Sequence, residues 1–209
     1  ANIGIFEITY DVTDSSGNSA TQAIRTIKVS PPDTEAPVIQ LLGNAILEIE
    51  VGTDYVEPGY YASDNFDDDE EITGKVVITN PVNTNLLGSY IIRYNVKDQA
   101  GNSAQEVIRS VEVKDTTAPV ITLKGNPTET IEVKTNYVDP GATASDNYDG
   151  NITDSISPEG VVNIDATGTY KLTYNVSDSS GNNAVEVSRT VNVVDTTKPV
   201  ITLNGDSFI

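Results

Sequence analysis

Residues 168–182 read GTYKLTYNVSDSSGN, and this stretch decides the fold. Apolar or aromatic side chains alternate with polar ones, the first group being Tyr170, Leu172, Tyr174 and Val176. Alternation with a period of two is typical of a half-buried β-strand. The Ser-Ser-Gly-Asn that follows predicts a turn, because Gly and Asn tolerate a positive φ. An antiparallel return strand is then predicted from Val185, Val187, Val191 and Val193.

The pattern is repeated along the chain. Related stretches occupy residues 4–18 and 88–102. A second motif, Asp-Thr-Thr-x-Pro-Val-Ile-Thr-Leu, starts at Asp115 and again at Asp195, and a variant starts at Asp33, so the spacings are 82 and 80 residues. We therefore predict the end of one repeat at 1–32, full repeats at 33–114 and 115–194, and the start of another at 195–209. We expect a longer array, with any signal peptide upstream.

Each repeat is predicted to be all-β. Short strands are expected at 120–123 and 130–133, split by Gly-Asn-Pro, and no helix is expected. Short strands, frequent turn residues and a unit of this length favour a β-sandwich.

The composition excludes several classes of function. The chain has 31 acidic and 12 basic residues, a net charge of −19, and neither Cys nor His. Such acidity disfavours nucleic acids and anionic membranes. Zinc, haem and iron–sulfur sites lose their usual ligands, and so do Ser-His-Asp and cysteine nucleophiles. No apolar run reaches the ~20 residues of a membrane helix. The acids recur in each repeat, so we expect no catalytic carboxylate pair and no enzyme activity.

Five motifs in this order resemble the bacterial immunoglobulin-like surface repeats, which are relatives of hyalin repeats. They are Asp-Thr-Thr-x-Pro-Val-Ile-Thr-Leu, Tyr-Val-Asp/Glu-Pro-Gly, Ser-Asp-Asn-x-Asp-Gly, Gly-x-Tyr-x-x-x-Tyr-x-Val and Asp-x-x-Gly-Asn. The resemblance implies tandem sandwiches of about seven strands at the bacterial cell surface, with a spacer or adhesive role. Tyr170 resembles a tyrosine corner, and Leu172 stands where antibody domains carry Cys. The insertion around Asp68 departs from the motif.

An immunoglobulin-like strand order brings three acidic elements to one end of each repeat. They are the opening Asp, the Ser-Asp-Asn-x-Asp loop and the Asp-x-x-Gly-Asn turn. Ca²⁺ takes six to eight oxygen ligands, so these loops predict calcium sites. The candidate ligands are Asp33, Asp64, Asp67, Asp69 and Asp98 in one repeat, and Asp115, Asp146, Asp149, Asp178 and Asn182 in the next. The alternative is a set of ordinary turns in which Asp caps its own backbone.

One arginine recurs on a face otherwise occupied by valine, as Arg25, Arg109 and Arg189. Two interpretations are open. A strand bulge turns the arginine outward, or the arginine pairs with the acid of Tyr-Val-Asp/Glu-Pro-Gly, which is Glu57 or Asp139.

We predict a structural spacer, stiffened by calcium at the junctions and partnered by neighbouring repeats of the same parent chain, with no membrane insertion. A short linker with Pro and repetition of one module favour this function. One alternative is a carbohydrate- or protein-binding module, for which the candidate aromatics are Tyr55, Tyr60, Tyr61, Phe66, Tyr137 and Tyr148. Another is a filament subunit assembled by strand complementation.

Overall fold

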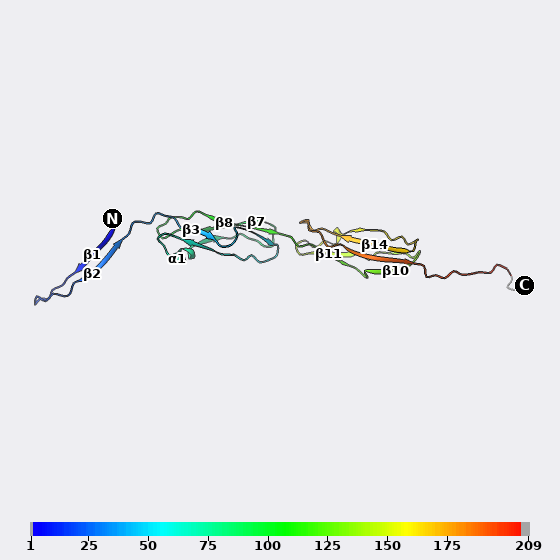
Figure 1. Cartoon of the computed structure of the whole chain (residues 1–209), viewed down its shortest axis with the longest axis horizontal. Coiled ribbons are helices and arrows are strands. Elements are labelled where there is room, and N and C mark those ends of the chain that lie inside the picture. The colour runs from blue at the N-terminus through cyan, green and yellow to red at the C-terminus, as the bar shows by residue number, and fades with distance from the viewer. Residues whose placement is uncertain (1, 206–209) are drawn as a thin grey trace. The chain divides into compact units, whose positions relative to one another are not determined.

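The computed structural model describes residues 2–205, and strands dominate it (Figure 1). The chain divides into two compact units. The first contains Ala1–Leu47, Val56–Val82 and Ile91–Val111, and the second contains Glu48–Tyr55, Asn83–Tyr90 and Glu112–Ile209. The predicted segments 1–32 and 195–209 include residues 1 and 206–209, which lie outside the described residues.

Residues 115–194 form two sheets. The strands are β9 (Val120–Leu123), β10 (Thr128–Glu132), β11 (Ala142–Asp146), β12 (Gly150–Asn151), β13 (Ser157–Glu159), β14 (Gly168–Asn175) and β15 (Val187–Val194). One sheet has the order β10-β15-β14-β13 and the other β12-β11-β9. In the first sheet β15 pairs antiparallel with β14 and parallel with β10.

The core of this repeat lies between the two sheets. Leu172, Tyr174 and Val176 come from or just follow β14, and they pack with Ile121 and with Ala142 and Ala144 of β11. The predicted alternation and the all-β sandwich are therefore confirmed. The tyrosine corner is also present, because the hydroxyl of Tyr170 donates to the carbonyl of Ala166 at 2.9 Å.

The return strand is shorter than its valines predict. Val185 is 84% exposed and precedes β15, which starts at Val187. The strand predicted at 130–133 starts two residues too late and ends one residue too late, since β10 spans Thr128–Glu132. Val133 still donates its backbone N–H to the carbonyl of Val194 at 2.7 Å, so the second difference is one of boundary only.

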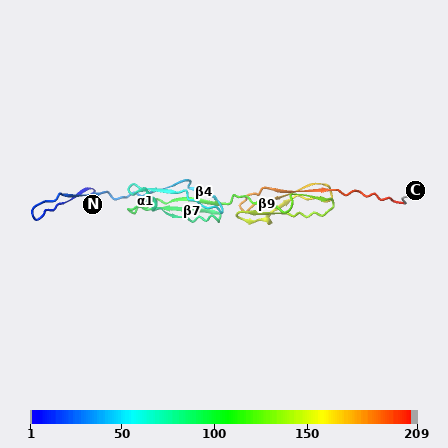
Figure 2. The ribbon, with the colours of Figure 1, turned by 90° about the horizontal axis from the view of Figure 1, so that it is seen from below.

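Residues 33–114 repeat this arrangement with one substitution of elements. The elements are β3 (Val38–Leu41), β4 (Ile46–Glu50), β5 (Tyr60–Ser63), α1 (Asp69–Gly74), β6 (Val77–Thr79), β7 (Gly88–Asn95) and β8 (Val107–Lys114) (Figure 2). Their sheets have the orders β4-β8-β7-β6 and β3-β5.

The helix α1 corrects the expectation that the chain contains none. Its N-cap is Asp68, whose side chain accepts from the backbone N–H groups of Glu70 and Glu71. Three acidic residues in the first turn interact favourably with the positive end of the helix dipole and so stabilise the helix. Ile72 anchors the helix in the core with no exposed surface. The two-residue insertion thus forms a capped turn of helix where the other repeat has the short strand β12. A 3₁₀ turn at Thr153–Ser155 is a second departure.

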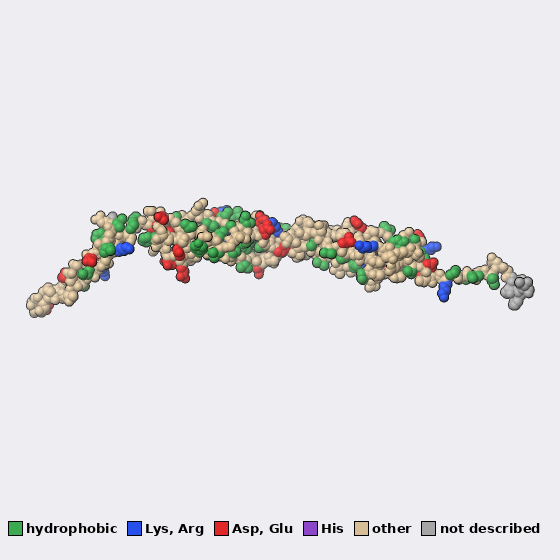
Figure 3. All heavy atoms as spheres, viewed as in Figure 1, with side chains coloured by type: hydrophobic (Ala, Val, Ile, Leu, Met, Phe, Trp, Pro, Cys, Tyr) green, Lys and Arg blue, Asp and Glu red, His purple; other side chains and the backbone are tan. Residues whose placement is uncertain are grey.

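The N-terminal hairpin consists of β1 (Gly4–Tyr10) and β2 (Ala23–Val29), paired from Gly4↔Val29 to Tyr10↔Ala23. Its apolar side chains are exposed, including Ile5 at 70%, and Figure 3 shows hydrophobic side chains along it. No described strand covers these positions, whereas the equivalent residues of β14 pack against β9 and β11. None of the described helices is long and apolar enough to span a membrane.

Candidate metal centre

Three carboxylates converge where β14, β11 and the linker before β9 meet. Asp146 is the last residue of β11, Asp178 follows β14, and Asp115 follows β8 in the linker. Each offers one oxygen atom, and these atoms all lie within 4.8 Å of one another. We call this group the second centre.

Two oxygens of the second centre have no hydrogen-bond partner among the described residues. Asp115 is only 7% exposed, and its Oδ1 accepts from the N–H of Thr117 at 3.2 Å. Its Oδ2 is buried and unpartnered, and the same is true of Oδ2 of Asp146. Buried carboxylate oxygens without a donor are costly. A cation would supply the missing partner.

Asp178 is held from one side. Its Oδ1 accepts from the N–H of Asn182 at 2.8 Å, and its Oδ2 accepts from Nδ2 of the same residue at 2.8 Å. The same Nδ2 also donates to the carbonyl of Asp115 at 3.2 Å. Asn182 therefore orients two members of the centre through its amide nitrogen. Ionised carboxylates have spare lone pairs, so Asp178 can still accept a cation.

Asp149 lies outside the cluster. Its Oδ2 accepts from the N–H of Ser179 at 2.6 Å, and its Oδ1 accepts from the Ser179 hydroxyl at 2.7 Å. Both oxygens accept hydrogen bonds from Ser179, so Asp149 connects the loop after β11 to the turn after β14 and lies beside the centre.

The preceding repeat contains the same arrangement, which we call the first centre. Asp33, Asp64 and Asp98 form it, and Oδ2 of Asp33 and of Asp64 is again buried and unpartnered. The remaining two candidates lie beside it. Oδ2 of Asp67 accepts from the N–H of Gln99 at 2.8 Å, and Oδ1 of Asp69 accepts from the N–H of Asp64 at 3.3 Å.

The turn hydrogen bonds do not by themselves indicate a metal. Asp14 accepts from the N–H and from Nδ2 of Asn18, both at 2.9 Å, in a hairpin where the described residues show no carboxylate cluster. The Asp-x-x-Gly-Asn turn thus forms locally, as the alternative interpretation states. The feature that favours a cation is the set of unpartnered buried carboxylate oxygens.

The electrostatics of the second centre are unfavourable without a counter-charge. Burial raises the pKa of Asp115, and the carboxylates of Asp146 and Asp178 raise it further. For Asp178, burial also acts to raise the pKa, but the hydrogen bonds from Asn182 outweigh it and lower the pKa. The donor set is oxygen only, which suits Ca²⁺ with water completing its shell.

A glutamate next to the second centre, Glu50, was not among the residues predicted from the sequence. The carboxylate of Glu50 accepts from the N–H of Thr116 at 2.9 Å and from the hydroxyls of Thr116 and Thr117 at 2.5 and 2.7 Å. Glu132 holds Thr196 and Thr197 in the same way. We call each arrangement a glutamate clamp. The signal was available, since Ile-Glu-Val occurs at both 49–51 and 131–133.

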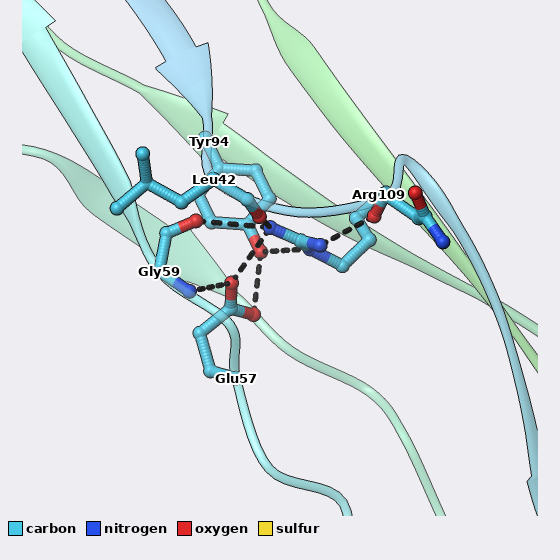
Figure 4. Close-up of polar contacts among 6 residues, drawn as sticks. Leu42, Glu57, Gly59, Tyr94 and Arg109 are labelled. Carbon is cyan, nitrogen blue, oxygen red and sulfur yellow. Dashed lines mark hydrogen bonds and ion pairs between the residues drawn. The ribbon is translucent and has the colours of Figure 1, made fainter.

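The recurring arginine is buried in both full repeats. Figure 4 shows the contacts of Arg109. Arg109 is completely buried, and its Nη2 lies 3.0 Å from Oε1 of Glu57. It also donates to the carbonyls of Leu42 and Gly59, both at 2.9 Å. The hydroxyl of Tyr94 donates to Oε2 of Glu57 at 2.6 Å and closes the network.

Arg189 pairs with Asp139 in the same way, with Nη1 at 2.8 Å from Oδ1. The ion-pair interpretation is therefore confirmed for these two arginines, and the outward bulge is wrong for them. Arg25 in the hairpin is exposed. We interpret the network as structural, because the guanidinium of Arg109 is completely buried and contacts backbone carbonyls and a carboxylate of its own repeat.

The motifs and the carboxylate centres occur once in each full repeat, and one known protein family also matches each full repeat once. The sequence model described as "Bacterial surface protein, Ig-like domain" matches residues 39–113 and 121–193. The chain belongs to this family. Each match lies inside one of the two full repeats predicted from the sequence.

The bacterial surface Ig-like chain is also similar to longer proteins. It is 28% identical over 209 residues to hyalin of Strongylocentrotus purpuratus, covering 96% of the chain and 17% of that protein. It is 29% identical over 191 residues to the outer cell wall protein of Brevibacillus brevis, covering 79% of the chain and 18% of that protein. The chain therefore spans less than a fifth of either relative.

Among solved structures, the bacterial surface Ig-like chain matches the CBM51-2 and INT domains of Clostridium perfringens ZmpB, solved in complex with GlcNAc. The identity is 33%, the match covers 37% of the chain and 17% of that structure, and the TM-score is 0.31.

Proposed function

We propose that the chain is a non-catalytic spacer of tandem Ig-like repeats in an extracellular bacterial surface or secreted protein, stiffened by calcium at the first and second centres. One observation carries the calcium part. Oδ2 of Asp115 is buried and unpartnered in a linker, within reach of two further carboxylates. Membership of a bacterial surface family supports the spacer part.

Asp115 is well placed to stiffen a linker. It follows β8 and precedes β9, while its two partners belong to the repeat that β9 begins. Without a cation the three carboxylates repel one another, so the electrostatic energy favours conformations in which Asp115 moves away from Asp146 and Asp178. With a bound cation the same carboxylates attract a common centre, and the backbone at Asp115 is restrained.

The carbohydrate-binding alternative receives less support from the aromatic side chains. Tyr60 packs against Tyr94 with ring centroids 5.4 Å apart, which is a framework contact. Tyr137 is partly buried against the core cluster. Tyr61, Phe66 and Tyr148 remain exposed, and Tyr61 is hydrogen-bonded to Gln40. Phe66 and Tyr148 occupy the same motif position, but Tyr61 has Thr143 as its counterpart, so one exposed ring and not a set of rings is shared by the two repeats.

Thermal melts of the chain in Ca²⁺, Mg²⁺ and EDTA test the calcium sites. We expect Ca²⁺ to raise the melting midpoint by several degrees. At a free Ca²⁺ concentration of about ten times the Kd, binding to one site stabilises the folded chain by about 1.4 kcal/mol. The double variant Asp64→Asn/Asp115→Asn removes one carboxylate from each centre and should abolish the response. Coincident curves for the wild-type chain in all three solutions would refute calcium binding.

Stiffening requires a separate measurement. The chain has no Cys, so cysteines can be placed at the exposed positions Val77 and Val161 and spin-labelled. We expect the distribution of label-to-label distances to be narrower in Ca²⁺ than in EDTA. Equal widths, in a chain whose midpoint does rise with Ca²⁺, would mean that calcium stabilises the repeats without stiffening the spacer.

A further inference from the structure

We infer that Glu50 is a positioning residue for the second centre, because it holds the two threonines that follow Asp115 and so presents that carboxylate to Asp146 and Asp178. The inference rests on the proposed calcium binding. It extends the centre from three ligands to a supporting residue on β4, which precedes Asp115 by more than sixty positions.

Three hydrogen bonds of Glu50 come from one dipeptide, and a fourth comes from Nδ2 of Asn147, the residue after Asp146, at 3.2 Å. Glu50 accepts the N–H and the hydroxyl of Thr116 and the hydroxyl of Thr117. The N–H of Thr117 donates to Oδ1 of Asp115. The dipeptide is therefore held by Glu50 on one side and by the ligand itself on the other. This leaves Oδ2 of Asp115 as the unpartnered oxygen in the centre.

A supporting contact of this kind affects cation affinity through preorganisation. If the linker is already fixed, the cation does not have to order it on binding. Partners that orient metal ligands typically change metal affinity by roughly 10- to 100-fold when they are removed. Calcium affinity at the second centre should therefore depend on Glu50, although Glu50 is not part of the carboxylate cluster.

The chain contains its own comparisons. The first centre has no clamp among the described residues, since Asp33 is followed by Thr34 and Glu35, and Glu35 donates its N–H to Asp33. Glu132 is a clamp without a centre, because it holds Thr196 and Thr197 beside Asp195, which belongs to no described carboxylate cluster. Clamp and centre occur together only at Asp115 within residues 2–205.

Calorimetric titration of the full chain with Ca²⁺ tests the inference. In a background of Asp64→Asn, which disables the first centre, Glu50→Gln should weaken calcium binding at the second centre about tenfold. Glu132→Gln removes an equivalent clamp, and Glu48→Gln removes a charge from the same strand. Both should leave the affinity unchanged. In the complementary background Asp146→Asn, Glu50→Gln should not affect the first centre.

A second variant separates positioning from charge and from misfolding. Thr116→Val/Thr117→Val removes both hydroxyl donors and keeps Glu50, and it should weaken the second centre as Glu50→Gln does. Melts in EDTA establish that each variant is folded. Calcium affinity that is unchanged in both variants would overturn the inference alone. A wild-type chain that binds no calcium would overturn the proposed function and this inference together.

Discussion

Nη1 of Arg189 lies 2.8 Å from Oδ1 of Asp139, and the arginine side chain is completely buried between the sheets of its repeat. Tyr174 donates its hydroxyl to Oδ2 of the same aspartate at 2.6 Å. Burial and this carboxylate hold the pKa of Tyr174 well above its usual value. The charge of Arg189 is therefore compensated inside an otherwise apolar core, and the same arrangement joins Arg109, Glu57 and Tyr94.

Removal of one partner should strongly destabilise a repeat. Asp139→Asn leaves the buried charge of Arg189 with only the longer ion pair to Oε1 of Glu129, at 3.7 Å. We therefore expect a loss of roughly 3 kcal/mol in the free energy of unfolding, at the lower end of the range for breaking a buried pair. Urea unfolding followed by circular dichroism measures it. Arg25→Met is the control, because this arginine is exposed and should cost under about 0.5 kcal/mol. Equal small effects at both positions would contradict a structural role for the pair.

The acidic residues outside the two centres should not be needed for calcium. Asp67→Asn and Asp149→Asn alter carboxylates that accept backbone N–H groups of Gln99 and Ser179. We expect titration calorimetry to give calcium affinities within about threefold of wild type, whereas Asp64→Asn should abolish binding at the first centre. Loss of binding in Asp67→Asn as well would move that residue into the ligand shell.

Replacing a residue that has a strained backbone conformation should stabilise the repeat 115–194. Lys134 has φ of 63°, in the left-handed region, and the equivalent residue of the preceding repeat is Gly52 with φ of 78°. Because only Gly adopts this region without strain, Lys134→Gly should raise the free energy of unfolding by up to about 1 kcal/mol. Gly52→Ala should lower it by a similar amount. Thermal melts in EDTA measure both, and a destabilised Lys134→Gly chain would contradict the expectation.

The clamp at Glu50 should make stability depend on pH. Burial acts to raise the pKa of Glu50, but hydrogen bonds from Thr116 and Thr117 outweigh it and lower the pKa from 4.5 to about 2. A depressed pKa in the folded state contributes stability that is complete above the unfolded value and is lost as the pH falls through the folded value.

We therefore expect the difference in melting midpoint between wild type and Glu50→Gln, measured in EDTA, to be constant above pH 5. It should shrink between about pH 4.5 and pH 2. Other acids titrate in both chains and cancel in the difference. A difference that persisted unchanged at pH 2 would mean that the carboxylate charge is not what holds the threonines.

Much of the fold follows from local pattern. The alternation around Tyr174 and the repeated Asp-Thr-Thr motif fix the strands, the repeat length and the sandwich, because one buried face demands one register. The turn from Asp14 to Asn18 forms in a hairpin that buries little, so it too is encoded locally. The helix α1 was missed because its signal, a cap at Asp68, lies in an insertion that interrupts the repeat.

The sequence predicted which loops meet at the candidate site. It did not predict which of their carboxylates point into the cluster. Asp64 and Asp67 are three residues apart in one loop, and only the backbone of that loop decides that Asp67 turns toward Gln99. The role of Glu50 was missed for a related reason. The repeated Ile-Glu-Val marks the glutamate, but its role depends on a pairing between β4 and the linker, which lie far apart in the sequence.

The parallel pairing of β10 with β15 has a consequence for chains under tension. Five residue pairs, from Thr128↔Thr190 to Glu132↔Val194, join a strand near the start of the repeat to the strand that ends it. When the two ends of the repeat are pulled apart, parallel neighbours slide past each other, so their hydrogen bonds are loaded together instead of opening one at a time. We expect each repeat to resist stretching by shear, with a rupture force set by the whole ladder and not by its weakest bond.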